Sequence, residues 1–361
     1  MTARKIRLAI LYGGRSAEHE VSVVSARSMM AAIDRDKYEI VPIAITKQGR
    51  WLLPERTPEQ LDAPAGSLPG TGDEGTGVSL VRDGEETAIR ALEGGGGLGS
   101  VDVVFPVLHG PYGEDGTVQG LLELAGVPYV GAGVLASALG MDKEMQKQLF
   151  ASRGLRVVPY IHVHIEDWRR SPDSLVELAA GEIGFPCFTK PSNLGSSVGI
   201  SRCRDADELR AGLEVALGHD RKALVERGIT ARELECAVLG NDEPEASIVG
   251  EVVPHRDFYD FAAKYLEDGS ELRIPAPIPD PVTEEVRRLA VEAFRAIDCA
   301  GMVRVDFFYE EATGTLYLNE VNTIPGFTPI SMYPKLWEAT GVPYAKLIDR
   351  LVELALERHR G

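Results

Sequence analysis

The first part of the chain alternates between short apolar runs and a helical segment, and this pattern limits the fold more than any other feature. Residues 7–12 form an apolar run that ends at a glycine pair, and residues 18–33 follow with helical spacing. Further apolar runs lie at residues 39–45 and 101–108. Strands that alternate with helices indicate a parallel sheet with helices on its faces. The sequence therefore predicts an α/β protein.

Residues 54–100 interrupt this pattern with a loose composition. They contain 11 glycines and 4 prolines, which are typical of turns and loops. We predict a mobile insertion there, interrupted at most by a short strand pair at residues 78–81 and 87–90. The whole chain has 361 residues, which is enough for two or three domains at roughly 150 residues per domain.

Beyond residue 141 the pattern changes to charged helices and paired strands. The expected helices are residues 142–153, 205–217, 282–297 and the C-terminal segment; the expected strands are residues 185–191, 223–226, 234–239, 247–253, 303–309 and 316–321.

The charge and cysteine content indicate which binding partners and which cellular compartment suit the protein. The chain has 38 basic and 55 acidic residues, a net charge of −17, so nothing suggests a basic face for nucleic acid or an anionic membrane. The longest uncharged stretch, residues 124–141, contains a proline and four glycines, so we expect no membrane span. The apolar run near the start is too short for a signal peptide. Four widely spaced cysteines fit a reduced cytoplasmic protein better than a disulfide framework or a zinc site.

The last strand pair carries the strongest local evidence for a site. Side chains alternate across a strand, so Arg304 and Asp306 share one face, and Glu320 and Asn322 share one face of the partner. A turn near Thr313 sets Asp306 about opposite Glu320, and facing like charges require a cation between them. Three oxygen donors without His or Cys suit a hard ion such as Mg²⁺. The alternative is a solvated outer face on which Arg304 neutralises both acids.

A Gly/Ser-rich segment follows the strand that ends at Lys190. Residues 191–199 contain two glycines and three serines, which offer backbone N–H groups and hydroxyls to phosphate oxygens, with Lys190 as a point charge. No Gly-Lys dipeptide occurs in the chain, so a Walker-type P-loop is excluded. The alternative is an ordinary flexible hairpin turn.

Two other segments end strands with polar residues. Residues 12–22 combine a strand end, two glycines and a helix start, which suits a small polar ligand, although Glu18 could simply complement the helix dipole. His109 ends a strand at the carboxyl edge of the sheet, where open α/β sheets bind ligands, although a lone His is more often a structural hydrogen-bonding residue.

Three further patterns are set aside. Residues 94–99 formally match GxGxxG but lie in the loose insertion, and residues 131–136 match a dinucleotide-binding variant without the acidic residue expected about 20 residues later. His162 and His164 share one strand face, but no third ligand is near them in the sequence. We therefore expect neither a nicotinamide site nor a metal site at these positions.

Seven motifs in order resemble the ATP-grasp superfamily, and specifically its D-alanine–D-alanine ligase family. They are GGRSAEHEVS, LHGPYGEDGTVQG, MDK, KPSNLGSSVGIS, KY, RVDF and NEVNTIPG. The resemblance implies an ATP-grasp fold with a Rossmann-like parallel-sheet domain at residues 1–140, which includes the insertion. It also implies two α+β domains, at residues 141–230 and 231–361, that clamp ATP, with a lid at residues 254–270.

The resemblance also implies roles for individual residues. Glu18, Ser196, Tyr265, Arg304 and Gly326 match catalytic positions, and His109, Ser331 and Met332 match substrate-binding positions. Lys143, Lys190, Ser197, Glu226, Glu233 and Lys264 match ATP-binding positions. Asp306, Glu320 and Asn322 match the ligands of two Mg²⁺ ions, for which Mn²⁺ could substitute.

The implied activity joins two D-alanines through a D-alanyl phosphate to give D-alanyl-D-alanine for peptidoglycan. The resemblance further implies a cytoplasmic homodimer with no nucleic-acid or membrane partner. One alternative is a D-alanine–D-lactate ligase, although such relatives commonly carry His where this chain has Tyr265. The other is a catalytically silent nucleotide-binding protein of the same fold.

Overall fold

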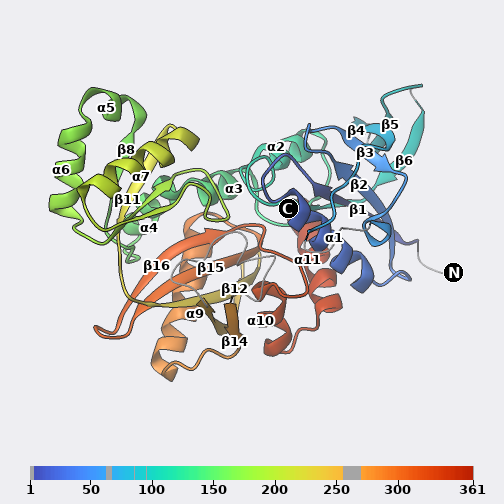
Figure 1. The fold of residues 1–361 in the computed structure, drawn as a ribbon. Coiled ribbons are helices and arrows are strands. Elements are labelled where there is room, and N and C mark those ends of the chain that lie inside the picture. Colours follow the sequence, from blue (N-terminus) through green and yellow to red (C-terminus); the bar gives the residue numbers. More distant parts are fainter. Residues whose placement is uncertain (1–3, 62–66, 85, 95, 255–269, 361) are drawn as a thin grey trace.

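The part of the chain that the structure describes forms three β-sheets and the helices that cover them (Figure 1). The computed structural model describes residues 4–61, 67–84, 86–94, 96–254 and 270–360. The sheets follow one another along the chain, from blue through green to red in Figure 1. Among the described residues, no helix combines the length and the apolar character needed to cross a membrane.

The first sheet has seven strands in the order β6-β5-β4-β3-β2-β1-β7. β1 is parallel to β2 and to β7, whereas the strands from β3 to β6 pair antiparallel. The elements are β1 (Ile6–Gly13), α1 (His19–Ala32), β2 (Tyr38–Ile45), β3 (Trp51–Pro54), η1 (Pro58–Gln60), β4 (Gly75–Asp83), β5 (Glu86–Ala91), β6 (Gly97–Val101), β7 (Val103–Val107) and α2 (Thr117–Leu124).

The apolar run in β1 reflects burial on both faces of the sheet. Leu8 and Ile10 belong to one hydrophobic core and Ala9 and Leu11 to another, and all four are completely buried. A parallel strand covered on both sides requires such a continuous apolar run. The predicted strand–helix–strand start of the chain is therefore confirmed.

The prediction for residues 54–100 is wrong in part. The expected strand pair is present, but β4 and β5 are longer than predicted and β6 adds a third strand, so residues 75–101 extend the first sheet. The glycines misled the prediction because many lie at turns and strand ends. Gly75 at the start of β4 and Gly84 just after its end, for example, have positive φ, a conformation that other residues rarely adopt.

The strand expected at residues 101–108 is present as β7, except that Val101 instead ends β6. β6 ends at Val101 and β7 begins at Val103, and these strands lie at opposite ends of the strand order. The Asp102 N–H donates to the Arg7 carbonyl, and the Asp102 carboxylate accepts from the Arg7 N–H at 2.8 Å. Because one residue joins the two outermost strands, the sheet curls until its edges approach each other.

The second sheet has the order β10-β9-β11-β8, with all neighbours antiparallel. Its helices pack over an apolar core that includes Leu209, Leu213 and Val225. Two helices, α3 (Val134–Met141) and α4 (Lys143–Ser152), connect it to the first sheet (Figure 1). The remaining elements are β8 (Tyr160–His164), α5 (Ile165–Arg170), α6 (Pro172–Glu182), β9 (Cys187–Pro191), β10 (Ser201–Cys203), α7 (Ala206–His219) and β11 (Lys222–Arg227).

The third sheet has the order β14-β13-β12-β15-β16. Helix α9 buries Val286, Ala290, Ala293 and Phe294, a helical spacing that places all four against the sheet. The elements are β12 (Arg232–Gly240), β13 (Glu245–Pro254), β14 (Ser270–Arg273), α9 (Asp280–Ala296), β15 (Gly301–Glu310), β16 (Thr315–Asn322), α10 (Met332–Thr340) and α11 (Tyr344–Arg360).

The two ends of the chain share one core. Residues of β1 and α1 belong to the same buried cluster as Tyr333, Leu347 and Leu351 of α10 and α11. Lys37 forms an ion pair with Asp349 at 2.6 Å across this contact. The C-terminal helices therefore hold the first sheet against the third. The predicted domain limits near residues 140 and 230 stay a prediction.

Candidate active site

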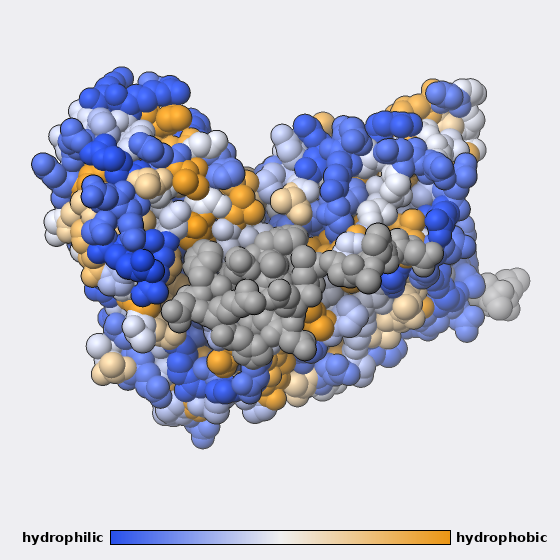
Figure 2. All heavy atoms as spheres, in the orientation of Figure 1, coloured by the Kyte–Doolittle hydropathy of each residue, from blue (hydrophilic) through white to orange (hydrophobic). Residues whose placement is uncertain are grey.

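A cavity of about 1100 Å³ lies where the three sheets meet. Figure 2 shows that the molecule is deeply notched between the lobe of α5–α7 and the lobe of β3–β6. Fifteen residues predicted for the site line the cavity: Glu18, His109, Lys143, Lys190, Ser196, Ser197, Glu226, Glu233, Arg304, Asp306, Glu320, Asn322, Gly326, Ser331 and Met332. The other two, Lys264 and Tyr265, lie outside the described residues, as does most of the predicted lid.

The acidic hairpin has the predicted register. Asp306 on β15 lies directly opposite Glu320 on β16, and Arg304 lies opposite Asn322. The Asn322 amide donates to Asp306 Oδ2 at 3.0 Å. The two carboxylates and the amide therefore line the cavity from adjacent strands, and their role as metal ligands stays a prediction.

Arg304 supplies positive charge to this hairpin. Its guanidinium donates to both carboxylate oxygens of Asp306 at 2.7 Å and contacts Glu235 Oε2 at 3.0 Å. Lys143 Nζ lies 3.4 Å from Glu320 Oε2, so each of the facing acids has its own cation. Glu235 is not among the residues predicted from the sequence, although it alternates with Glu233 on β12 and so faces the same side of the strand.

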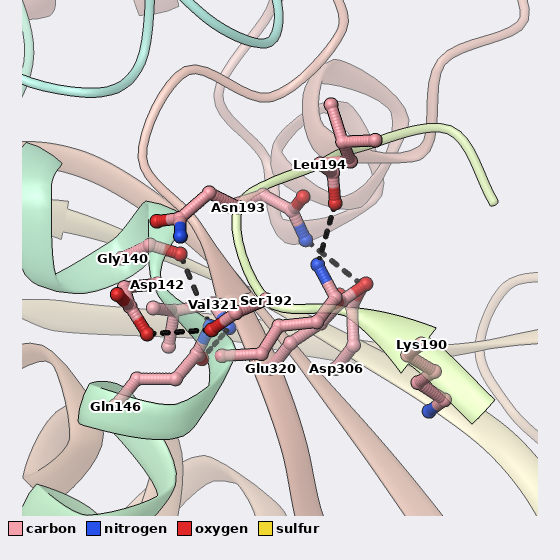
Figure 3. Close-up of polar contacts among 12 residues, drawn as sticks. Gly140, Asp142, Gln146, Lys190, Ser192, Asn193, Leu194, Asp306, Glu320 and Val321 are labelled. Carbon is pink, nitrogen blue, oxygen red and sulfur yellow. Dashed lines mark hydrogen bonds and ion pairs between the residues drawn. The ribbon is translucent and has the colours of Figure 1, made fainter. Parts of the chain in front are cut away.

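The Gly/Ser-rich segment is attached to the start of α4 (Figure 3). The Lys143 ammonium donates to the Leu194 carbonyl at 2.8 Å, and the Lys143 N–H donates to the Ser192 carbonyl at 3.0 Å. Ser192 Oγ donates to Asp142 Oδ1 at 2.7 Å, while the same carboxylate oxygen caps the helix at the Met145 N–H. The loop and the first lysine are thus positioned as one unit.

Two serines of this loop have unusual backbone conformations. Ser196 and Ser197 have φ values of 53° and 59°, in the left-handed region that serine rarely adopts. The Val198 N–H donates to the Gly195 carbonyl at 3.2 Å, so these serines are the two central residues of a tight turn, where a primed hairpin turn has positive φ at both positions. The binding of phosphates by this loop stays a prediction.

A buried ion network lies beneath the loop. Glu226 Oε2 is 2.8 Å from Lys190 Nζ, and Glu226 Oε1 is 3.2 Å from Lys147 Nζ. Burial alone would raise the pKa of Glu226, but the charges of the two lysines lower it. Lys147 is almost completely buried, which lowers its pKa. Its position one helical turn after Lys143 is the sequence signal that could have identified it.

A second cluster of polar contacts is centred on Glu18. Ser196 Oγ donates to Glu18 Oε1, which joins the Gly/Ser-rich loop to the start of α1. An added Cβ at Gly110 would meet Glu18 Oε2 at 2.9 Å, and one at Gly195 would meet it at 3.2 Å. Both glycines therefore keep space open beside the carboxylate.

His109 lies next to the polar residues around Glu18, and its side chain is buried. Its Nδ1–H donates to the Ile324 carbonyl at 3.1 Å, and Nδ1 lies 3.9 Å from Glu114 Oε1. Burial alone would lower the pKa of His109, but the hydrogen bond and charge of Glu114 and the charge of Glu18 raise it. Burial also raises the pKa of Glu114. Because the Glu114 carboxylate also accepts from the Gly110 N–H, we assign the proton to the imidazole.

This arrangement predicts how His109 titrates. An NMR titration should give a pKa above the ordinary value of about 6.5, and Glu114→Gln should lower it by removing the neighbouring charge. The folded-state pKa is raised, so the stability contributed by the charged ring is fully present below the unfolded pKa and is lost as the pH rises through the folded pKa. A His109 pKa at or below the ordinary value would contradict this assignment.

The remaining predicted residues lie near the start of α10 and on β12. Ser331 is the N-cap residue of α10 but makes no side-chain capping hydrogen bond; its Oγ instead accepts from the Thr328 N–H at 3.0 Å. A Cβ at Gly326 would meet Ser331 Oγ at 2.6 Å, so a larger residue there would displace this hydroxyl. Met332 is buried, and Glu233 pairs with Phe308 and lines the cavity.

The donor set on the acidic hairpin fits magnesium. Carboxylate and amide oxygens are hard ligands, and they line a cavity that also contains two lysines suited to phosphate oxygens. A hard divalent ion bridging to phosphates typically uses only a few protein carboxylates in this way.

Fold and cavity together define an ATP-grasp ligase, in which facing sheets enclose a nucleotide and divalent metal ions. Two family models match the chain: "D-ala D-ala ligase N-terminus" over residues 7–132 and "D-ala D-ala ligase C-terminus" over residues 149–353. The chain belongs to the D-alanine–D-alanine ligase family, whose members use ATP and divalent metal ions.

Individual relatives agree with this assignment. A D-alanine–D-alanine ligase of Thermoanaerobacter sp. (strain X514) is 51% identical over 364 residues, with 98% of each chain covered. The structure of the D-alanine–D-alanine ligase from Coxiella burnetii is 35% identical with a TM-score of 0.85, covering 99% of this chain and 96% of that one. The VanG D-Ala:D-Ser ligase from Enterococcus faecalis is 34% identical with a TM-score of 0.83, covering 98% of this chain and 100% of that one.

Proposed function

We propose that this protein is an ATP-dependent ligase that joins two D-alanines to form D-alanyl-D-alanine for peptidoglycan synthesis. The observation that carries the proposal is the single cavity that brings together the Glu18–Ser196 pair, the lysines Lys143 and Lys190, and the acidic hairpin. A carboxylate for a substrate ammonium, cations for phosphates and oxygen donors for a metal are the parts that carboxylate activation by ATP needs.

In the first half-reaction, a carboxylate oxygen of the first D-alanine attacks the γ-phosphorus of ATP, giving D-alanyl phosphate and ADP. Glu18, held by Ser196, binds the ammonium of this substrate, and His109 lies beside it. Lys143 and Lys190 hold the phosphates while negative charge spreads over the transferring group. Asp306, Glu320 and Asn322 would hold two Mg²⁺ ions, which would neutralise negative charge at the phosphates.

In the second half-reaction, the deprotonated amine of the second D-alanine attacks the acyl carbon. The new C–N bond forms, a proton leaves the nitrogen and phosphate departs. Arg304 and the Gly326 N–H stabilise the oxyanion, and the start of α10 at Ser331 and Met332 receives the carboxylate of the second substrate. Glu226 fixes Lys190, and Glu233 and Ser197 complete the nucleotide site with Lys264.

The finer assignments rest on the family resemblance. They are the count of two magnesium ions, the use of Mn²⁺ in their place, the homodimer, and the roles of Tyr265 and the lid. A cytoplasmic location agrees with the four cysteines, which are all buried and free.

The proposal predicts a strict substrate requirement. ADP release should depend on D-alanine and not on L-alanine, and the product should be D-alanyl-D-alanine. The similarity to a D-Ala:D-Ser ligase makes the second substrate the open choice, so D-serine and D-lactate should be offered together with D-alanine. We expect D-alanyl-D-alanine to be the main product at neutral pH. No stimulation by D-alanine would overturn the ligase assignment, whereas a dominant depsipeptide or D-seryl product would change only the second substrate.

A further inference from the structure

A histidine pair outside the cavity acquires a third possible ligand in the folded chain. His162 and His164 lie on β8, the edge strand of the second sheet, and Glu144 lies in the first turn of α4. One donor atom from each residue lies within 4.8 Å of the other two. Among the residues that the structure describes, no other group of three His, Cys, Asp or Glu side chains meets this criterion.

The strand geometry explains how the two rings come together. Residues two apart on a strand point to the same face, and the two imidazoles stack edge to face with centroids 5.6 Å apart. Their partners across β11 are Leu224 and Lys222. Because β8 has no strand on its other side, α4 can approach, and His162 Nδ1 lies 3.7 Å from Glu144 Oε1.

The contacts of Glu144 leave its Oε1 atom directed at the imidazole rings of His162 and His164. Glu144 Oε2 is 3.0 Å from Lys222 Nζ, which also contacts Asp142. Glu144 Oε1 accepts from Gln148 Nε2 at 3.1 Å. Lys222 thus binds Oε2 of the carboxylate, while Oε1 keeps a lone pair that can bind a further cation. The Glu144 side chain is 7% exposed and that of His162 is 51% exposed, so the cluster pairs a buried anchor with an accessible ring.

We propose that Glu144, His162 and His164 form a binding site for a zinc-class divalent ion. Two imidazoles and one carboxylate are the ligands that Zn²⁺ prefers, whereas Mg²⁺ prefers oxygen. Bonds of about 2.0–2.1 Å in a tetrahedral site place ligand atoms about 3.3 Å apart, so small rotations of the exposed ring close the site. Water completes the coordination. This site is separate from the acidic hairpin, and the proposal does not depend on the ligase activity.

The experiment measures zinc binding to the full chain, freed of metal with a chelator and kept in excess Mg²⁺ to occupy the oxygen-rich hairpin. Isothermal titration with Zn²⁺ should give one ion per chain. Substitution of Co²⁺ should give the intense visible bands of a tetrahedral site. His162→Ala, His164→Ala and Glu144→Gln should each weaken binding roughly tenfold or more. His359→Ala, which removes an exposed histidine of α11, is the matched control and should bind as the parent does.

The variants make the outcome decisive. His162 is half exposed, so its replacement leaves the fold intact, and a melting curve checks this for every variant. Zn²⁺ should raise the melting temperature of the parent and of His359→Ala but not of His162→Ala/His164→Ala. Unchanged zinc affinity in that double variant, or no zinc binding by the parent, would overturn the proposal.

Discussion

Glu320→Gln is expected to reduce the rate of dipeptide formation by about 10²–10³-fold while the protein stays folded. The change removes one negative charge without changing the side-chain volume, and charge neutralisation at a transferring phosphoryl group is worth several kcal/mol. Glu320 faces Asp306 across the hairpin and lines the cavity, so the loss should appear in kcat at saturating Mg²⁺. Initial rates of ADP and dipeptide release measure the effect.

Glu311→Gln is the matched control for this variant. Glu311 follows β15 in the same hairpin, but its side chain is 69% exposed. It should retain the parent rate and melting temperature. Near-normal turnover of Glu320→Gln would show that this carboxylate takes no part in the reaction, whatever the fold.

Glu226→Gln is expected to lower the free energy of unfolding by about 3–5 kcal/mol. Removing one partner of a buried ion pair leaves an uncompensated charge, and Glu226 faces two lysines in a site with almost no exposure. Urea denaturation measures the change. Glu177→Gln on the exposed face of α6 is the control and should alter stability by less than about 0.5 kcal/mol.

A double variant separates the network from a general packing defect. Lys147→Met/Glu226→Gln removes one charge of each sign, so part of the stability lost in Glu226→Gln should return. The pH dependence gives a second check. The folded pKa of Glu226 is lowered, so its stabilisation is present above the unfolded pKa and is lost as the pH falls through the folded pKa. The stability difference between the parent and Glu226→Gln should therefore stay constant above the unfolded pKa of about 4.3 and shrink as the pH falls below it, toward the folded pKa. A difference that does not shrink below the unfolded pKa would contradict the network.

The hairpin of the third sheet illustrates what local sequence reasoning can reach. Strand alternation and a short turn depend only on neighbouring residues, so the pairing of Asp306 with Glu320 followed from the sequence and is confirmed. The strand at the start of the chain and the amphipathic helix α9 were predictable for the same reason.

Residues 75–101 show where composition misleads. Their glycines indicated a loose insertion, but the strands formed there are stabilised by pairing with a sheet whose other members lie far away in the sequence. The strand propensity of a short stretch of sequence does not include the stability gained from that pairing.

The sequence by itself determined the strand and helix at the start of the chain, the register of the acidic hairpin, and the family. Only the tertiary structure decided which charged groups meet. It placed Glu226 between Lys147 and Lys190, Glu235 beside Arg304, and Glu144 beside the two histidines of β8. The physical reason is that alternation and helical spacing are fixed by backbone geometry within a few residues, whereas a buried ion pair or a metal site depends on the packing of elements that are distant in the chain.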